Sequence, residues 1–254
     1  MEAYKIQKQI LEAMESSKKA AVITVIKTEG SAPQKPGAKM IVYEDKLIVG
    51  TIGGGAIEFK LTEDALNVIE SGKAQMFSYN LGAQLGMCCG GKMDAFIEPT
   101  EPLKKLVIFG AGHISAELVP LAKKIGFHVT VIDDREDFAN KERLPQADEV
   151  IFEHYDYTLD KLTFDNSTFI VIVTHQHKYD DEILTRIIDK EYAYLGMIGS
   201  KTKFEKTKLR LKSQNFSDQI ISKVHTPIGI KISAKTPFEI ALSISCELVN
   251  YKYI

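Results

Sequence analysis

Short runs of apolar and β-branched residues, separated by turn-rich segments, dominate the N-terminal part of the chain. They predict strands in AAVITVIKTE, AKMIVY, KLIVGTI, AQMFSYNL and KMDAFIEP. Apolar residues one helical turn apart predict a helix near residues 6–16 and a second helix after Gly53-Gly54-Gly55. This mixture of elements is typical of an α+β domain.

The pattern changes after Pro99 and Pro102, which bracket a short polar stretch where neither a helix nor a central strand continues. Fully apolar runs follow in LVIFG, HVTVID, EVIF, FIVIVT and YAYLGMIG, with helical segments between them such as 114–125 and 181–189. Such runs fit parallel strands buried on both faces. We therefore expect an α/β chain, with residues 1–102 forming an N-terminal α+β domain and residues 103–254 forming a Rossmann-like, doubly wound parallel-sheet domain.

Composition narrows the class of protein. Hydrophobic residues make up 44% and charged residues 26% of the chain, and the net charge is −2, which favours a globular protein that binds neither nucleic acid nor a membrane. No run approaches the roughly 20 apolar residues of a membrane span. The N-terminal segment MEAYKIQKQ lacks the basic start and apolar run of a secretory signal, and the three cysteines are too few for a disulfide framework. These features predict a cytoplasmic protein.

The segment LVIFGAGHIS combines a strand, a glycine turn and a helix start. Gly110 allows the tight turn, Gly112 lets the backbone approach a pyrophosphate, and Ser115 stands where a third glycine is usual. Asp133 and Arg135 follow the next strand at the spacing of a dinucleotide-binding fingerprint. We expect Asp133 to accept hydrogen bonds from a ribose diol, which favours NAD, while Arg135 offers the alternative of facing a 2′-phosphate.

A second glycine-rich loop, Gly53-Gly54-Gly55, also joins a strand to a helix. Its backbone N–H groups are expected to cradle an anion, with Glu58 in the first turn of the following helix. The alternative is that the glycines only form a sharp turn and that Glu58 complements the helix dipole.

Other polar residues follow predicted strands of the Rossmann-like domain. His113 lies in the fingerprint turn, where it either donates to a phosphate, acts as a general acid or simply faces solvent. His175 belongs to THQH, whose spacing makes a metal conceivable, although lining of the ligand crevice fits better without a third ligand. Ser200 is expected to cap the next helix, and Lys201 to meet a phosphate there.

Cys88 and Cys89 are adjacent in a loop that is open with glycines, GMCCGG. Neighbouring cysteines rarely pair with each other, and structural cysteines usually lie in apolar strands. Thiolates in such a loop suit a soft metal, a sulfur atom or a reactive substrate. The alternative is two passive thiols. Cys246 lies among apolar residues of the last predicted helix, where it fits the core.

Nine strings together resemble the xanthine dehydrogenase accessory proteins of the XdhC/CoxI type. They are GSAPQKPGAKM, GTIGGGAIE, LGMCCGG, FGAGHIS, VIDDR, THQHKYD, GMIGSKTK, HTPIGIKI and TPFEIALSI, in family order over residues 30–244. Gln34 departs from the family pattern, in which an arginine is usual. The resemblance implies an N-terminal domain joined to a Rossmann-like domain, and a homodimer.

The resemblance also implies a function. Family members bind molybdenum cofactor (molybdopterin), help it gain a sulfido ligand from a cysteine desulfurase, and pass it to the apo-enzyme of a molybdenum hydroxylase such as xanthine dehydrogenase. This chain is then a cofactor chaperone more than a turnover enzyme, with Cys88 and Cys89 as metal contacts and, together with Glu58, as candidate catalytic residues. The rival hypothesis is an NAD(P)-dependent oxidoreductase with His113 as its acid, and a third is a nucleotide-sensing regulator.

Overall fold

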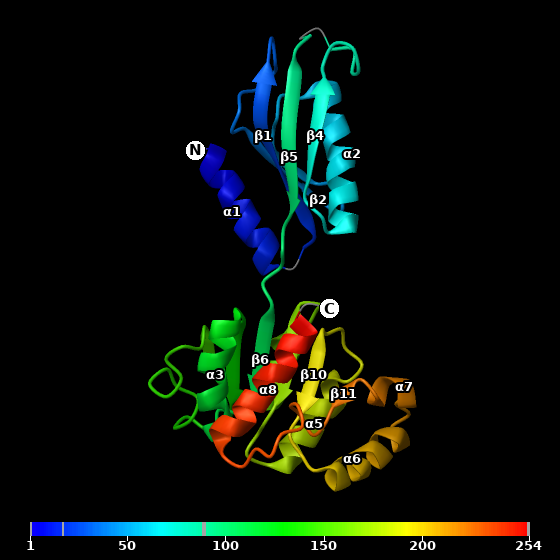
Figure 1. Cartoon of the computed structure of the whole chain (residues 1–254). Helices are drawn as coiled ribbons and strands as arrows, with labels where there is room; N and C mark the ends of the chain where they lie inside the picture. Colours follow the sequence, from blue (N-terminus) through cyan, green and yellow to red (C-terminus); the bar gives the residue numbers. More distant parts are fainter. Residues whose placement is uncertain (1, 17, 88–89, 253–254) are drawn as a thin grey trace. The chain divides into compact units, whose positions relative to one another are not determined.

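The chain divides into two units, Met1–Pro102 and Leu103–Ile254, each built around its own sheet (Figure 1). The computed structural model describes residues 2–16, 18–87 and 90–252. The boundary between the units falls at the second of the two prolines that interrupt the polar linker in the sequence.

The first unit holds an antiparallel sheet of five strands in the order β3-β2-β1-β5-β4. Its elements are α1 (Glu2–Glu15), β1 (Ala20–Glu29), β2 (Lys39–Tyr43), β3 (Ile48–Gly50), α2 (Gly55–Ser71), β4 (Gln75–Asn80) and β5 (Lys92–Pro99). Every strand and helix predicted for this part of the sequence is present, with bounds that differ by a few residues.

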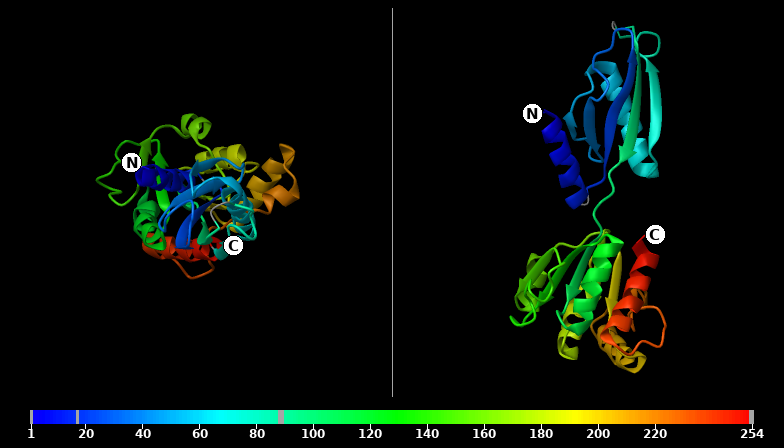
Figure 2. Two further views of the ribbon diagram at one scale, coloured as in Figure 1. Left: turned by 90° about the horizontal axis from the view of Figure 1, so that it is seen from above. Right: turned by 60° about the vertical axis from the view of Figure 1, so that its left-hand side comes forward.

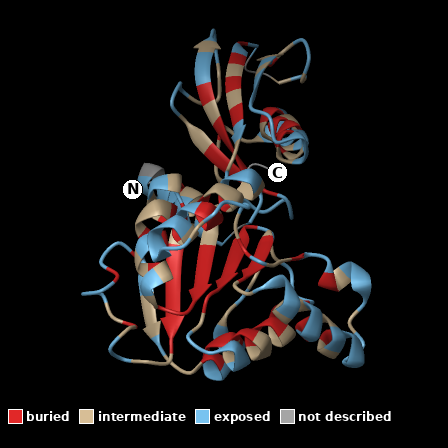
Figure 3. Cartoon of the chain, turned by 60° about the horizontal axis from the view of Figure 1, so that its bottom comes forward, coloured by how far each residue is buried: buried red, intermediate tan, exposed pale blue. Residues whose placement is uncertain are grey.

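Alternation along the strands decides where the helices of this unit pack. Ile23 and Val25 of β1 belong to one apolar cluster with Ile57 and Leu61 of α2. Neighbouring positions point the other way, and there Ala20, Ile41 and Tyr43 form a separate cluster with Ala13 of α1. The striped burial of β5 in Figure 3 follows the same alternation.

The second unit is a parallel sheet of six strands in the order β11-β10-β9-β6-β7-β8. The elements are β6 (Lys105–Phe109), α3 (His113–Ile125), β7 (His128–Asp133), β8 (Glu149–Phe152), α4 (Tyr155–Lys161), β9 (Thr168–Ile172), α5 (His177–Ile187), β10 (Tyr194–Met197), α6 (Lys201–Ser213), α7 (Asp218–Ile221), β11 (Val224–His225) and α8 (Pro237–Lys252). Renumbered within the unit, this is the 3-2-1-4-5-6 order of the Rossmann fold. The predicted fold class is therefore confirmed.

Helices cover both faces of the parallel sheet. α3 and α8 pack side by side on one face, over a cluster that includes Leu106 and Ile108 of β6 (Figure 1 and Figure 2). The opposite face buries Val107 and Phe109 of the same strand, together with residues of α4 and α5. Strands β6, β7, β9 and β10 are accordingly buried along most of their length (Figure 3), as their apolar runs predicted. The prediction is wrong for the run EVIF, because β8 lies at the edge of the sheet and none of its residues is buried.

Within the described residues, no helix combines the length and the apolar character that a membrane crossing needs.

Gly110 fixes the turn between β6 and α3. Its φ is +111°, and a Cβ placed there would lie 2.4 Å from the carbonyl oxygen of Val173, just beyond β9. At Gly112, by contrast, a Cβ would meet no atom within 4 Å, and the φ is an ordinary −75°. The close approach of the turn to β9 therefore requires a glycine at 110 but not at 112.

This contrast gives a matched pair of variants. We expect Gly110→Ala to lower the free energy of unfolding by about 3 kcal/mol or more, because it combines a strained φ with a backbone clash. Gly112→Ala should cost about 1 kcal/mol or less, as an alanine at an N-cap does. Chemical unfolding followed by circular dichroism measures both, and equal losses would contradict the assignment.

Candidate functional site

A pocket of about 410 Å³ lies in the second unit where the carboxyl ends of its central strands meet the starts of α3 and α8. β6 pairs with β7 on one side and with β9 on the other, so the chain reverses its direction of winding here. Open parallel sheets bind their ligands at such a switch point. The lining comprises Gly112, His113, Ile114, Arg135, Phe138, Val173, Thr174, His175, Lys235, Pro237 and Ile240.

The start of α3 gives the pocket an anion-binding character. Gly112 is its N-cap and supplies no side-chain cap, and the first turn contains no acidic residue. Uncapped N–H groups and the positive end of the helix dipole favour a bound anion. Ser115, where a third glycine is usual, is fully buried and donates its hydroxyl to the carbonyl oxygen of Gly110, so the substitution is accommodated.

The start of α8 forms the other wall. Thr236 and Glu239 form a capping box: Glu239 N–H donates to Thr236 Oγ1 over 3.2 Å, and Thr236 N–H donates to the Glu239 carboxylate over 2.9 Å. Pro237 occupies the first helical position. The exposed Lys235 directly before this box lines the pocket and adds a positive charge.

Lys235 was missed in the sequence, although a signal for it exists. A helix that follows a strand of a parallel sheet begins at the carboxyl edge of that sheet. A basic residue directly before such a helix is therefore a candidate ligand contact.

Asp133 is fully buried at the end of β7 and is saturated with hydrogen bonds. It accepts from Ala111 N–H at 2.7 Å, from Arg135 N–H at 3.0 Å, and from Arg135 Nε and Nη2 at 2.8 Å each. Burial opposes ionisation, but the bonds from Arg135 and Ala111 outweigh it and lower the pKa of Asp133.

This geometry corrects the expectation that Asp133 binds a ribose diol. A carboxylate accepts about four hydrogen bonds, and all four are used within the protein. Asp133 instead ties the fingerprint turn to β7 and orients Arg135. Arg135 is the residue of this strand end that lines the pocket, where its guanidinium lies 3.8 Å over the ring of Phe138.

His113 and His175 both line the pocket, as expected for residues at the carboxyl ends of strands. The two histidines of THQH take different partners, however. His175 Nδ1 lies 3.7 Å from Asp134 Oδ1, whereas His177 Nδ1 lies 3.2 Å from Asp180 Oδ2. The HxH spacing therefore does not bring them to one metal.

Ser200 caps α6 as predicted, accepting a hydrogen bond from Lys203 N–H at 3.2 Å. Lys201 is exposed at the first position of that helix. Neither residue lines the pocket. Lys203 is engaged within the protein, since its Nζ donates to the buried carboxylate of Asp180 over 3.1 Å.

The glycine loop of the first unit is closed by its own side chain. Glu58 accepts from Thr51 Oγ1 at 2.7 Å, from Ile52 N–H at 3.1 Å and from Gly54 N–H at 3.0 Å, and Gly53 N–H donates to Thr51 Oγ1. The expected anion cradle is therefore wrong for these N–H groups, because the Glu58 carboxylate already accepts from Ile52 and Gly54, and the Thr51 hydroxyl accepts from Gly53. The alternative, a turn braced by Glu58, fits the geometry.

Three loops of the first unit nevertheless come together. A Cβ at Gly53 would lie 2.5 Å from Pro33, one at Gly55 would lie 3.7 Å from Met87, and one at Gly91 would lie 2.2 Å from the carbonyl oxygen of Ser31. GSAPQKPG, GTIGGG and the residues that flank the cysteine pair are thus neighbours. Cys88 and Cys89 themselves lie outside the described residues. Cys246, a free thiol, is partly buried in α8.

The fold and the pocket define a Rossmann-type domain with a pocket at its switch point, preceded in the chain by a small α+β unit. Known families match both parts: the XdhC Rossmann domain matches residues 106–248, and the XdhC and CoxI family matches residues 13–80. The chain belongs to the XdhC/CoxI family, as its sequence motifs indicate.

Curated relatives point the same way. The chain is 31% identical over 237 residues to the uncharacterized protein YqeB of Escherichia coli (strain K12), which covers 91% of this chain and 43% of YqeB. It is 31% identical over 155 residues to a probable xanthine dehydrogenase subunit of Bacillus subtilis (strain 168), covering 61% of this chain and 45% of that protein. The chain therefore spans less than half the length of these two relatives.

A third relative matches nearly end to end. The molybdenum cofactor insertion chaperone PaoD of Escherichia coli (strain K12) is 20% identical over 275 residues, covering 95% of this chain and 86% of PaoD. Among solved structures, a protein described as a xanthine dehydrogenase from Bacillus halodurans has a TM-score of 0.55 at 23% identity, over 96% of this chain and 94% of that one. This likeness supports the fold.

The Asp133–Arg135 pair gives a testable stability effect. Arg135→Met leaves a buried carboxylate without its charged partner, which should cost about 3–5 kcal/mol of unfolding free energy near pH 7. In the wild type the lowered pKa of Asp133 gives stability that is present above about pH 4 and is lost as the pH falls further. Arg135→Met lacks this contribution, so the difference in unfolding free energy between the wild type and the variant should shrink as the pH falls.

Arg143→Met is the matched control. Its guanidinium lies 4.6 Å over the same Phe138 ring, but the residue is exposed. It should cost less than about 1 kcal/mol at every pH. Urea unfolding at several pH values separates the two variants, and a pH-independent deficit for Arg135→Met would contradict the role of Asp133.

Proposed function

We propose that this chain is a maturation factor that binds molybdenum cofactor and promotes its insertion into a molybdenum hydroxylase such as xanthine dehydrogenase. Membership of the XdhC/CoxI family supports this role. The similarity to PaoD, a molybdenum cofactor insertion chaperone, extends over nearly the whole of both chains. The finer steps, which are sulfuration with a cysteine desulfurase and action as a homodimer, form part of the same proposal.

The pocket of the Rossmann-type unit is the observation that carries the proposal. Molybdopterin bears a phosphate, which a nucleotide often extends. An uncapped helix start and the ammonium of Lys235 line one cavity and suit such an anion, and Arg135, whose charge is balanced by Asp133, lines the same cavity. We assign the phosphate or nucleotide portion of the cofactor to this pocket, with His113 and His175 as further polar contacts.

We propose that the thiols of the cysteine loop contact the molybdenum of the cofactor or its sulfur ligand. Met87, directly before the pair, lies beside the glycine loop that Glu58 braces, and Gly91, after the pair, lies against Ser31. Glu58 is thereby assigned a positioning role in place of the catalytic one. Soft thiolates suit the molybdenum–sulfur centre of the cofactor better than carboxylates do.

An NAD(P)-dependent oxidoreductase remains the second candidate, and the Rossmann strand order with His113 in the pocket favours it. The occupied carboxylate of Asp133 disfavours it, because the usual acceptor for the ribose diol is already bound within the protein. Saturable binding of NADH with hydride transfer to a small substrate would replace the chaperone hypothesis. Saturable binding of a molybdenum cofactor without turnover supports it.

Co-expression with a molybdenum hydroxylase tests the proposed function. We expect the hydroxylase to lose most of its activity and molybdenum when this chain is absent. Lys235→Glu should lower the molybdenum content of the hydroxylase by roughly three- to tenfold, because it reverses a charge at the phosphate site. Metal analysis and activity of the purified hydroxylase give the result.

Lys231→Glu is the control, since Lys231 is exposed in the same loop but does not line the pocket. It should leave hydroxylase maturation unchanged. Full hydroxylase activity without this chain would refute the maturation role. Equal effects of the two lysine variants would refute the assignment of the pocket while leaving the role itself intact.

The thiol assignment has its own test. Protein purified from a host that makes molybdopterin should carry substoichiometric molybdenum, and the double variant Cys88→Ala/Cys89→Ala should lose it. Cys246→Ala is the control, because this thiol lies in α8 of the other unit. Equal molybdenum in the wild type and the double variant would overturn the assignment.

A further inference from the structure

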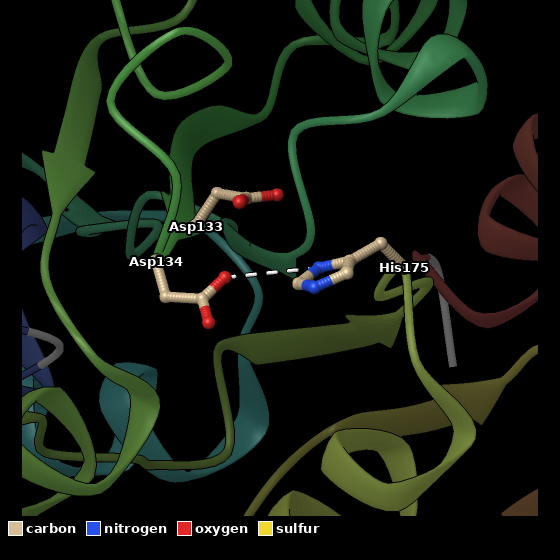
Figure 4. A group of neighbouring side chains, drawn as sticks. All are labelled: Asp133, Asp134 and His175. Atoms are coloured by element: carbon tan, nitrogen blue, oxygen red, sulfur yellow. Dashed lines mark ion pairs between the residues drawn. The ribbon is translucent and has the colours of Figure 1, made fainter.

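Three possible metal ligands converge at the carboxyl edge of the parallel sheet. Asp133 ends β7, Asp134 follows it, and His175 lies in the loop after β9. One ligand atom of each lies within 4.8 Å of those of the other two. In Figure 4 the ring of His175 points toward the two aspartates, and its ion pair with Asp134 is drawn.

Asp134 has a buried, unsatisfied carboxylate oxygen. Its Oδ1 atom is buried and accepts no hydrogen bond from the described part of the chain. The side chain as a whole is only 15% exposed. A buried carboxylate oxygen without a donor or a cation is costly, so native proteins rarely leave one.

A second buried group nearby is also unsatisfied. Tyr155, the first residue of α4, is 2% exposed, and its hydroxyl has no hydrogen-bond partner among the described residues. The rings of Tyr155 and His175 both pack against Tyr179, with centroids 5.3 Å and 5.4 Å from that ring. This region of the structure therefore holds two buried polar atoms without a partner among the described residues.

The distance between Asp134 and His175 suits an ion better than a direct bond. The same Oδ1 atom that lacks a partner lies 3.7 Å from His175 Nδ1, which is too long for a hydrogen bond. Two donors that each lie about 2.1 Å from one metal ion are roughly 3 Å apart at right angles and about 4.2 Å apart in line. The observed separation falls inside that range.

Asp133 takes a different part in the cluster. Its lone pairs are engaged by Arg135 and the backbone, so Asp133 has none left for an ion, whereas Asp134 Oδ1 has no hydrogen-bond partner among the described residues. His175 also lines the anion pocket. Positions of the ion that the protein leaves open are therefore available to water or to a phosphate oxygen.

We propose that Asp134 and His175 bind a divalent first-row transition-metal cation at the edge of the anion pocket. One carboxylate and one imidazole form a mixed oxygen and nitrogen donor set, which suits ions such as Mn²⁺ or Zn²⁺. This metal site does not depend on molybdenum cofactor, so binding of the metal is tested on protein that carries no cofactor.

Mn²⁺ is the appropriate probe, because thiolates such as those of the cysteine loop prefer softer metals. The full chain is stripped with a chelator and titrated with Mn²⁺, and the free ion is followed by electron paramagnetic resonance. We expect one tight Mn²⁺ per chain in the wild type. Asp134→Asn and His175→Ala should each weaken binding by at least about tenfold.

Pulsed electron paramagnetic resonance shows directly whether the His175 nitrogen binds the metal, which a purely structural role of His175 would not produce. Nitrogen coupling to the bound Mn²⁺ should be present in the wild type and absent from His175→Ala. His177→Ala is the matched control, because it belongs to the same loop but pairs with Asp180. It should retain both the affinity and the nitrogen coupling.

Thermal melting guards against misfolded variants. Asp134→Asn removes the unpaired negative oxygen, so the metal-free variant should melt at or above the temperature of the metal-free wild type. Mn²⁺ should raise the melting temperature of the wild type but not that of Asp134→Asn. No stoichiometric Mn²⁺ binding below millimolar concentration, or equal affinity in all four proteins, would overturn the proposal and leave the orphaned groups to a buried water.

Discussion

The carboxylate of Asp133 is the interaction on which the Rossmann-type unit depends. It joins the end of β7 to the N–H group of Ala111 in the fingerprint turn and holds Arg135 by two side-chain bonds. The turn itself is pressed against the end of β9 at Gly110. Three strand ends are thus fixed together, and the pocket between the starts of α3 and α8 inherits its geometry from them.

The same pairing sets the charge of the pocket. Because Arg135 is largely neutralised by Asp133, the remaining positive potential comes from Lys235 and the uncapped start of α3. At Asp134, next in the chain, Oδ1 accepts no hydrogen bond from the described residues, and His175 Nδ1 lies 3.7 Å from it. One strand end therefore holds two neighbouring acids, of which Asp133 is paired with Arg135 and Asp134 is the acid to which we assign the added cation.

Much of the architecture was predictable from the sequence, since apolar runs and glycine turns indicate where strands lie and how strands and helices alternate along the chain. The short elements α4, α7 and β11 were missed because four to seven helical residues, or a two-residue strand, leave too little periodicity. The role of Asp133 was misassigned for another reason. Spacing places a residue at a strand end, but only the fold shows that Arg135 two positions later occupies the carboxylate.

The two glycine-rich loops show why similar sequences lead to different sites. Both join a strand to a helix, and both were expected to receive an anion. At α2 the chain supplies its own carboxylate, Glu58, which holds the loop N–H groups and repels a further negative charge. At α3 no acid occurs in the first turn, and cationic side chains stand opposite. The two loop environments therefore favour a phosphate at the start of α3 and disfavour one at the loop before α2.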